Sequence, residues 1–237
     1  MMLRATVVIP CYNQGSYLME ALASVGAQTL SDVEVVVVDD GSTDVDTIRI
    51  ISEISQPRTT VIRTRNQGLA AARNTGIAVA RTPYILPLDA DDLIGERYIE
   101  QAARVLDEDE GVGIVYCNGE KFGAATGRLD LPDFIPGRIC RVNPIFCSAM
   151  FRRRDWELAG GYKKTMKYGW EDWEFWLSIL ELGRSVVRLP DCLFYYRVRE
   201  DSMTRTMAYW QKVLMMTHMV MSHPRFYLKH ILRGSLR

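Results

Sequence analysis

The sequence predicts an α/β protein with one mostly parallel sheet and helices on both faces. Short apolar runs alternate with segments of helical periodicity between residues 1 and 92. One run, from Val33 to Asp39, contains four consecutive valines, the pattern of a parallel strand that is buried on both sides. Alternating strands and helices form βαβ units, so we expect the strands of this half to end at one edge of the sheet.

Each element follows from a local pattern. Apolar runs bounded by turn residues predict strands at 5–10, 33–39, 60–63, 84–88, 111–117 and 185–189. Apolar residues at helical spacing predict helices at 15–29, around Ile48, Ile51 and Ile54, and at 68–80, 95–106, 170–182 and 205–222. Residues 119–142 are rich in Gly, Pro and Asp, so we expect a mobile loop there.

Composition excludes several classes of protein. The net charge of zero argues against a nucleic-acid binder. The five cysteines form no C-x-x-C pair, and all three histidines lie in the last twenty residues, so we expect free thiols and no zinc site. We see no signal peptide, no membrane-spanning apolar run, no G-x-G-x-x-G fingerprint and no P-loop. These observations predict a cytoplasmic protein.

An acidic cluster follows the predicted strand at 84–88. At a separation of roughly 4 Å, each pair among Asp89, Asp91 and Asp92 repels by about 4 kcal/mol. A hard cation such as Mg²⁺ or Mn²⁺ would relieve that repulsion, and the carboxyl edge of an open α/β sheet is where ligands bind. The alternative is an Asp-rich turn that caps the next helix.

Two further acidic pairs follow other elements. Asp39 and Asp40 follow the second strand, at the same expected edge as Asp89, so Asp40 could accept a hydrogen bond from a base while the cluster holds a metal on a diphosphate. Taken alone, Asp40 is better explained as a turn residue in Asp-Gly-Ser. Glu171 and Asp172 open a helix, where they could simply stabilise the helix dipole by about 0.3–1 kcal/mol.

Five motifs in order carry a family resemblance. They are Val7-Val8-Ile9-Pro10-Cys11-Tyr12-Asn13, Val38-Asp39-Asp40-Gly41-Ser42-Thr43-Asp44, Asn66-x-Gly68-x-Ala70-x-Ala72-Arg73-Asn74, the Asp-x-Asp motif Asp89-Ala90-Asp91, and Trp170-Glu171-Asp172. Together they resemble glycosyltransferase family 2 over roughly residues 6–205. The resemblance implies a GT-A fold, a nucleotide-sugar donor (most often a UDP-sugar), Mn²⁺ or Mg²⁺, and transfer with inversion. It places a GT-A domain at 1–204, with a nucleotide-binding half at about 1–92 and an acceptor half at about 93–204.

The resemblance also implies roles for individual residues on the donor side. Pro10, Tyr12 and Asp40 would surround the base, with Tyr12 stacked on it. A second group would line the nucleotide and its phosphates: Asn13, Asn66, Gly68 and Arg73. Without the motif, Arg73 would be interpreted as a solvated helix residue.

On the metal and acceptor side, the resemblance implies that Asp91 is the principal metal ligand. Asp89 would contact ribose, or the metal through water. Asp172 would be the base that takes the proton of the acceptor hydroxyl, with Glu171 as the next candidate.

One position departs from the family pattern. Family members often carry Tyr-Arg-x-His after the last core strand, whereas this chain has Arg199 at the His position. An Arg cannot ligate a cation but can pair with phosphate, so we expect weaker metal binding. The run Arg152-Arg153-Arg154 is either a second phosphate contact or a solvated surface cluster.

The C-terminal segment, residues 205–237, combines apolar residues with six Lys or Arg and no acidic residue. We expect a basic amphipathic helical extension that packs on the domain or on a second copy in a homodimer, or that lies on an anionic membrane at its inner face.

We therefore expect an inverting, metal-dependent glycosyltransferase that adds a sugar to a growing glycan or lipid-linked acceptor. A nucleotidyltransferase is the first alternative, but it usually has a Gly-rich basic loop after the first strand, where this chain has Pro10-Cys11-Tyr12-Asn13. A non-catalytic nucleotide-sugar binding module is the second, and it would not need Glu171 and Asp172.

Overall fold

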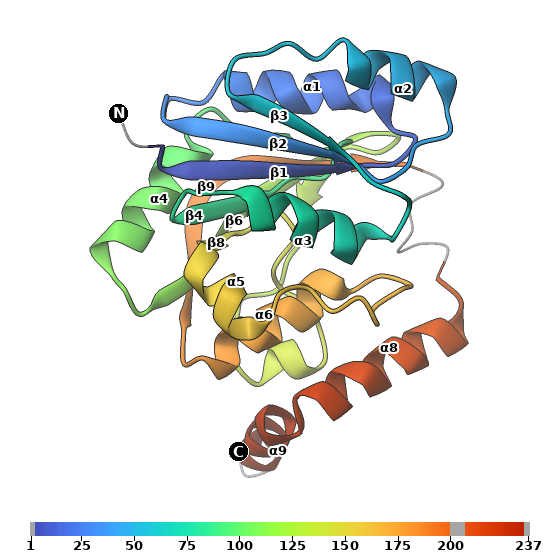
Figure 1. Cartoon of the computed structure of the whole chain (residues 1–237). Helices are drawn as coiled ribbons and strands as arrows, with labels where there is room; N and C mark the ends of the chain where they lie inside the picture. Colours follow the sequence, from blue (N-terminus) through green and yellow to red (C-terminus); the bar gives the residue numbers. More distant parts are fainter. Residues whose placement is uncertain (1–2, 200–206, 235–237) are drawn as a thin grey trace.

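A mixed β-sheet forms the centre of the protein, and helices pack on both of its faces (Figure 1). The computed structural model describes residues 3–199 and 207–234. Its strands, in chain order, are β1 (Ala5–Cys11), β2 (Val33–Asp39), β3 (Thr59–Arg63), β4 (Tyr84–Pro87), β5 (Leu93–Ile94), β6 (Val112–Gly123), β7 (Gly127–Leu129), β8 (Met150–Arg152) and β9 (Ser185–Val198). Its helices are α1 (Gly15–Gly26), α2 (Val45–Ser52), α3 (Leu69–Val79), α4 (Tyr98–Glu108), α5 (Arg153–Ala159), α6 (Glu171–Glu181), α8 (Tyr209–Ser222) and α9 (Pro224–Gly234), with a 3-10 turn at Arg138–Cys140.

The strand order brings several strand ends to one edge. The order is β3-β2-β1-β4-β8-β6-β9-β5, and β7 pairs with β6. β1, β2, β3 and β4 are parallel to one another, as β6 is to β9, whereas β8 is antiparallel to both β4 and β6. The carboxyl ends of β1, β2, β4, β6 and β9 therefore meet at one edge, which the segment before β8 also reaches. We call this the carboxyl edge.

Alternate residues of β1 pack into two apolar cores, one on each face of the sheet. Val7 and Ile9 face α1 and α4, and all of their side chains are buried. Val8 faces the opposite way, into a core that contains Ile77 of α3 and Trp176 of α6. The expectation of helices on both faces of a mostly parallel sheet is confirmed.

The expectation of a mobile loop at 119–142 is wrong in its first part. Residues up to Gly123 continue β6, and β7 turns back to pair with it. The cause is the partner strand: β9 extends to Val198, well beyond the predicted end at residue 189, and pairs with β6 through Gly123. The backbone N–H and C=O groups of the β6 and β9 extensions pair with each other, and this pairing is not visible in the local sequence of either segment.

The C-terminal segment forms two helices that lie beside the domain (Figure 1). α8 begins at Tyr209, and the predicted helix start at 205, like the predicted domain boundary at 204, lies outside the described residues. Pro224 occupies the first position of α9, where a missing backbone N–H costs nothing. Met215 and Met219 anchor α8 in the core on the α6 side of the sheet. Among the described residues, no helix has the length and apolar content needed to cross a bilayer.

Candidate active site

The predicted site residues converge at the carboxyl edge. β1 ends at Cys11, β2 at Asp39, and Leu88 continues the path of β4 by donating its N–H to the carbonyl of Val8 at 3.0 Å. The turns that follow these strands hold Tyr12, Asp40 and the cluster at 89–92. The parallel sheet thus places three of the five motifs side by side.

The turn after β1 contains the exposed ring of Tyr12 and the side chain of Asn13, which bonds to the turn after β2. Tyr12 is 44% exposed, so its ring is available for stacking. Asn13 has a left-handed φ of 55°, and its side-chain oxygen accepts the N–H groups of Thr43 and Asp44 at 2.8 and 3.0 Å. The backbone N–H of Asn13 also donates to Ser42 at 3.0 Å. Asn13 therefore joins the turns after β1 and β2.

Asp40 is held firmly by the segment that precedes α3. It is 4% exposed, and its carboxylate accepts from the Thr64 hydroxyl at 3.0 Å and from the N–H groups of Gln67 and Gly68 at 3.0 and 2.8 Å. Gly68, with φ 88°, also caps α3. A base N–H would therefore be an additional donor to a carboxylate that is already oriented. Asn66 is exposed in the same segment.

Gly41 allows the turn after β2 to lie close to the segment that precedes α3. Its φ is 75°, and a Cβ at this position would lie 2.6 Å from the backbone nitrogen of Asn66. Glycine is therefore required both for the left-handed conformation and for the contact.

Arg73 does not behave as a solvated helix residue, because it is 1% exposed. Its guanidinium donates to Asp89 through Nη2 at 2.6 Å and to Glu171 through Nη1. It also lies over the ring of Tyr162, with Cζ 5.6 Å from the centroid. Burial lowers the pKa of Arg73, but Asp89 and Glu171 more than compensate and hold it well above its usual value. Arg73 therefore joins the cluster after β4 to the first turn of α6.

The cluster after β4 carries more negative charge than its partners balance. Asp91 pairs with Arg199, Oδ2 to Nη1, at 3.0 Å, yet burial and the charge of Asp89 still raise its pKa. Asp92 is buried and accepts the backbone N–H of Arg197 at 2.8 Å. Burial, followed by the charges of Asp89 and Asp91, holds the pKa of Asp92 well above its usual value.

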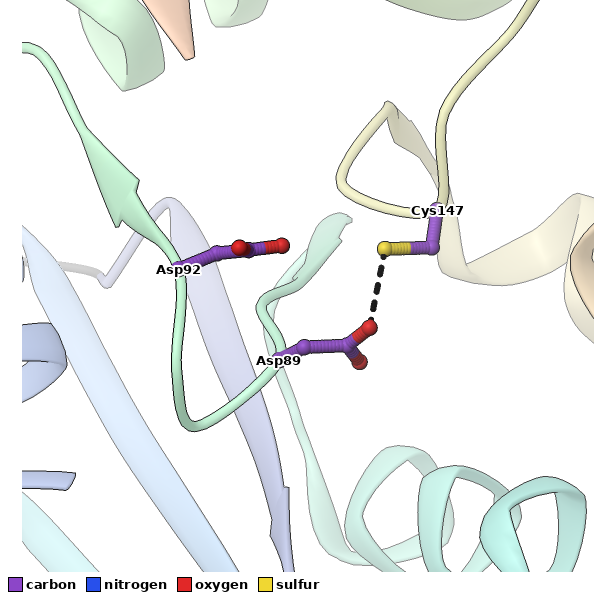
Figure 2. A group of neighbouring side chains, drawn as sticks. All are labelled: Asp89, Asp92 and Cys147. Carbon is purple, nitrogen blue, oxygen red and sulfur yellow. Dashed lines mark hydrogen bonds between the residues drawn. The ribbon is translucent and has the colours of Figure 1, made fainter. Parts of the chain in front are cut away.

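A third element reaches this cluster from the segment before β8. Figure 2 shows the Cys147 thiol pointing at Asp89, with Sγ donating to Oδ2 at 3.2 Å, and Asp92 beside them. Each of these three residues offers a ligand atom within 4.8 Å of the other two. Burial raises the pKa of Cys147 well above its usual value, so the sulfur is a neutral thiol and not a ligand for a hard cation.

A divalent cation fits the cluster on grounds of charge and chemistry. Burial, and after it repulsion among the carboxylates of the cluster, raises the pKa values of Asp91 and Asp92, and carboxylate oxygens are the ligands that Mg²⁺ and Mn²⁺ prefer. Among the described residues, Asp89 and Asp92 are the carboxylates that offer oxygens within 4.8 Å of each other, whereas Asp91 lies outside that group. Asp89 and Asp91 are less buried than Asp92. Arg199 pairs with one oxygen of Asp91.

Glu171 and Asp172 start α6 but lie in different environments. Glu171 is 5% exposed and bound to Arg73. Asp172 is partly buried, and its Oδ2 accepts from Asn143 Nδ2 at 3.1 Å. Burial and the neighbouring charge of Glu171, opposed by Arg73, raise the pKa of Asp172 to about 7. A carboxylate with this pKa is suited to general base catalysis at neutral pH.

Several residues were not foreseen at this site. Asn143 and Cys147 come from the segment before β8, where the sequence shows no motif. Arg197 was visible only as part of the motif that contains Arg199, and its Nε donates to the carbonyl of Asp91 at 2.8 Å.

The run Arg152-Arg153-Arg154 lies elsewhere. Arg152 pairs with Tyr84 at the start of β4, which is the opposite edge of the sheet, and donates to the carbonyl of Leu106 at 2.6 Å. It is therefore not a second phosphate contact.

Comparison with known proteins agrees with this geometry. The profile described as "Glycosyl transferase family 2" matches residues 6–169. The chain is 28% identical over 184 residues to a chondroitin synthase of Escherichia coli, covering 75% of this chain and 26% of that protein. It is 31% identical over 220 residues to the succinoglycan biosynthesis protein ExoO of Rhizobium meliloti, covering 85% of this chain and 63% of ExoO. The chain thus spans about a quarter of the chondroitin synthase and less than two thirds of ExoO.

The fold has solved counterparts. A structure of S. aureus TarS in complex with UDP-GlcNAc superposes with a TM-score of 0.72 at 21% identity, covering 87% of this chain and 62% of that one. A second TarS structure gives a TM-score of 0.70 at 23% identity, covering 82% and 60% of the two chains. These matches confirm the expected GT-A fold.

The family profile covers well over half of the chain and includes four of the five motifs in full, up to the residue before Trp170. The expectation drawn from the motifs is therefore confirmed: this chain belongs to glycosyltransferase family 2.

Proposed function

We propose that this chain transfers a sugar from a nucleotide-sugar, specifically a UDP-sugar, to a hydroxyl group of a glycan or lipid-linked acceptor, with inversion at the anomeric carbon. The observation that carries the proposal is the Arg73 bridge. Arg73 connects Asp89, a member of the acidic cluster that suits a metal–diphosphate, with Glu171. Glu171 precedes Asp172, whose pKa is raised to about 7. Leaving group and base would then face each other across one site.

On the donor side, Tyr12 and Asp40 are the groups that would receive the base. The exposed ring of Tyr12 offers a stacking surface, and Asp40 can accept an imide N–H of uracil. The TarS complexes with UDP and UDP-GlcNAc support this choice of nucleotide by analogy of fold. Pro10, Asn13, Asn66 and Gly68 would shape the pocket around them.

On the phosphate side, Asp89 and Asp91 would hold Mn²⁺ or Mg²⁺. The bound cation would neutralise charge on the departing diphosphate. Arg199 is 20% exposed and lies beside Asp91, so its guanidinium could pair with the same diphosphate. Arg73 is a positioning residue, since it is buried and reaches the reaction through Asp89 and Glu171.

On the acceptor side, Asp172 would act as the base. The acceptor oxygen attacks the anomeric carbon from the face opposite the diphosphate, the bond from that carbon to the diphosphate oxygen breaks, and the acceptor proton moves to the Asp172 carboxylate. Asn143 orients that carboxylate through its Oδ2. Glu171, which is bound to Arg73, is less available for the same role.

The donor assignment can be tested by thermal stabilisation. UDP and UDP-sugars should raise the melting temperature, and Mn²⁺ should increase the effect of UDP. GDP and CDP serve as controls for the base, and uridine serves as a control for the diphosphate. Stabilisation by no nucleotide diphosphate, with or without Mn²⁺, would contradict the proposal.

A further inference from the structure

The outward face of α8 is apolar. Met215 and Met219 are 1% and 0% exposed, so they mark the side that packs on the domain. Six large apolar residues are exposed on the same helix: Tyr209, Trp210, Val213, Leu214, Val220 and Met221. At about 100° per residue, these six lie within an arc of about 140° whose centre is roughly opposite the buried pair. We call them the α8 outer face.

This arrangement reverses the usual pattern of a surface helix, whose outward side is polar. The polar residues Gln211, Lys212 and His218 lie on the flanks of α8, between the buried side and the outer face. Thr217 is the polar residue at the centre of the outer face, and its hydroxyl donates to the carbonyl of Val213 at 2.8 Å. Contiguous exposed apolar patches of this kind mark interaction sites. The α8 outer face is therefore expected to be buried in an interface with another molecule or with a membrane.

The charges around this face indicate what covers it. From Arg205 to the end of the chain there are six Lys or Arg and no acidic residue. Lys212 is exposed at the edge of the α8 outer face, and Leu228 of α9 is 62% exposed. Arg225 and Lys229 are also exposed on α9, but they line a cavity beside Glu181 and Arg184 and not the α8 outer face. A second copy docked through the same surface would bring like charges together, whereas anionic lipid headgroups would neutralise them. Trp210 and Tyr209 are residue types that favour the bilayer interface.

We propose that the α8 outer face, with Lys212 at its edge, docks this chain on an anionic lipid bilayer. The helix would lie in the plane of the interface, since apolar and basic side chains together suit the boundary between acyl chains and headgroups.

The docked surface would begin beside the acceptor side of the site. The ring of Trp210 packs edge-on against Tyr168, with centroids 5.3 Å apart, and Tyr168 precedes Asp172 by four residues. A bilayer on the α8 outer face would therefore lie close to the segment that leads into α6. This placement suits a lipid-linked acceptor, a conclusion that rests on the proposed transfer reaction. Binding to the bilayer does not depend on that reaction.

The test is flotation of the full chain with vesicles, without donor or acceptor. One set of vesicles is phosphatidylcholine, and the other is an equal mixture of phosphatidylcholine and phosphatidylglycerol. We expect binding to the mixed vesicles that weakens as salt is raised. The double variant Val213→Gln/Met221→Gln should lower the partition coefficient at least about tenfold, because two apolar side chains leave the interface. Lys212→Gln should cost about fivefold on the mixed vesicles only.

The matched control is Val79→Gln/Met19→Gln. Val79 in α3 and Val213 are both 48% exposed, and Met19 in α1 is 44% exposed, so the control makes the same chemical change away from α8. It should bind vesicles like the unmodified chain. Melting temperatures of all variants show that each remains folded. Equal losses in the control and the α8 variant would overturn the proposal.

A spectroscopic measurement identifies the residue that enters the lipid. Mixed vesicles should shift the tryptophan emission to shorter wavelength, and Trp210→Phe should abolish the shift. Sedimentation without vesicles tests the competing occupant. A dimer that is lost in Val213→Gln/Met221→Gln, together with no vesicle binding, would show that a second copy covers the α8 outer face and would overturn the proposal.

Discussion

Replacing Asp172 by Asn tests the assignment of the base with little change in shape. The amide keeps the size of the side chain and can still cap a helix, but it cannot take the proton of an attacking hydroxyl. Positioned bases of this kind contribute about 10²–10⁴-fold to rate. We therefore expect turnover to fall by about that factor, while UDP affinity stays within a few-fold, because the group acts on the acceptor and not on the donor.

The structure also predicts the sign of the stability change. Burial and the charge of Glu171 raise the pKa of Asp172 from 3.8 to about 7, so the folded protein holds this proton more tightly than the unfolded chain does. Stability is therefore lost as the pH rises from about 4 to about 7, where the unfolded carboxyl ionises before the folded one. Asp172→Asn has no carboxyl to ionise, and above pH 7 it should be more stable by on the order of a few kcal/mol.

Three measurements on this one variant decide the matter: turnover with saturating donor, calorimetric UDP affinity, and urea denaturation at pH 5 and pH 8. The unmodified enzyme should also gain about tenfold in turnover between pH 6 and pH 8, since the base must be ionised. A helix-dipole role predicts preserved turnover and a loss of about 1 kcal/mol or less. Preserved turnover would refute the assignment and make Glu171 the next candidate.

Three further predictions concern the donor side. Asp91→Asn should largely abolish transfer and remove any Mn²⁺-dependent tightening of UDP binding, with the melting temperature retained; normal metal-dependent activity would show that the cluster is misassigned. Calorimetry should find UDP bound more tightly than GDP or CDP, because Asp40 accepts the imide N–H of uracil. Tighter binding of GDP would contradict the assignment of uracil as the base. Arg73→Met should lower the free energy of unfolding by about 3–5 kcal/mol, because the buried carboxylate of Glu171 loses its guanidinium partner. Adding Glu171→Gln should recover part of that loss in urea denaturation, and no recovery would argue against the ion pair.

The sequence by itself determined the edge at which the site forms. Continuous apolar runs such as 33–39 predict buried parallel strands, and parallel strands bring their carboxyl ends together. Asp40 and Asp89 are therefore expected at the same edge of the sheet. The apolar stripe that contains Trp173 and Trp176 predicts a buried helix here, and hence places Asp172 in the first turn of that helix. Local periodicity is enough for these conclusions because each depends on residues close together in the chain.

The tertiary structure decided what each side chain does at that edge. Arg73 pairs with Glu171 across 98 residues of sequence, and Asn143 reaches Asp172 from a segment without a motif. Asn13, expected beside the nucleotide, has its side-chain oxygen bound to the turn after β2. No local pattern encodes such partners, because they are chosen by burial: a charge or polar group that leaves water must find whatever partner the packing brings near it. The extension of β6 and β9 into the predicted loop has the same origin, since each strand satisfies the backbone of the other.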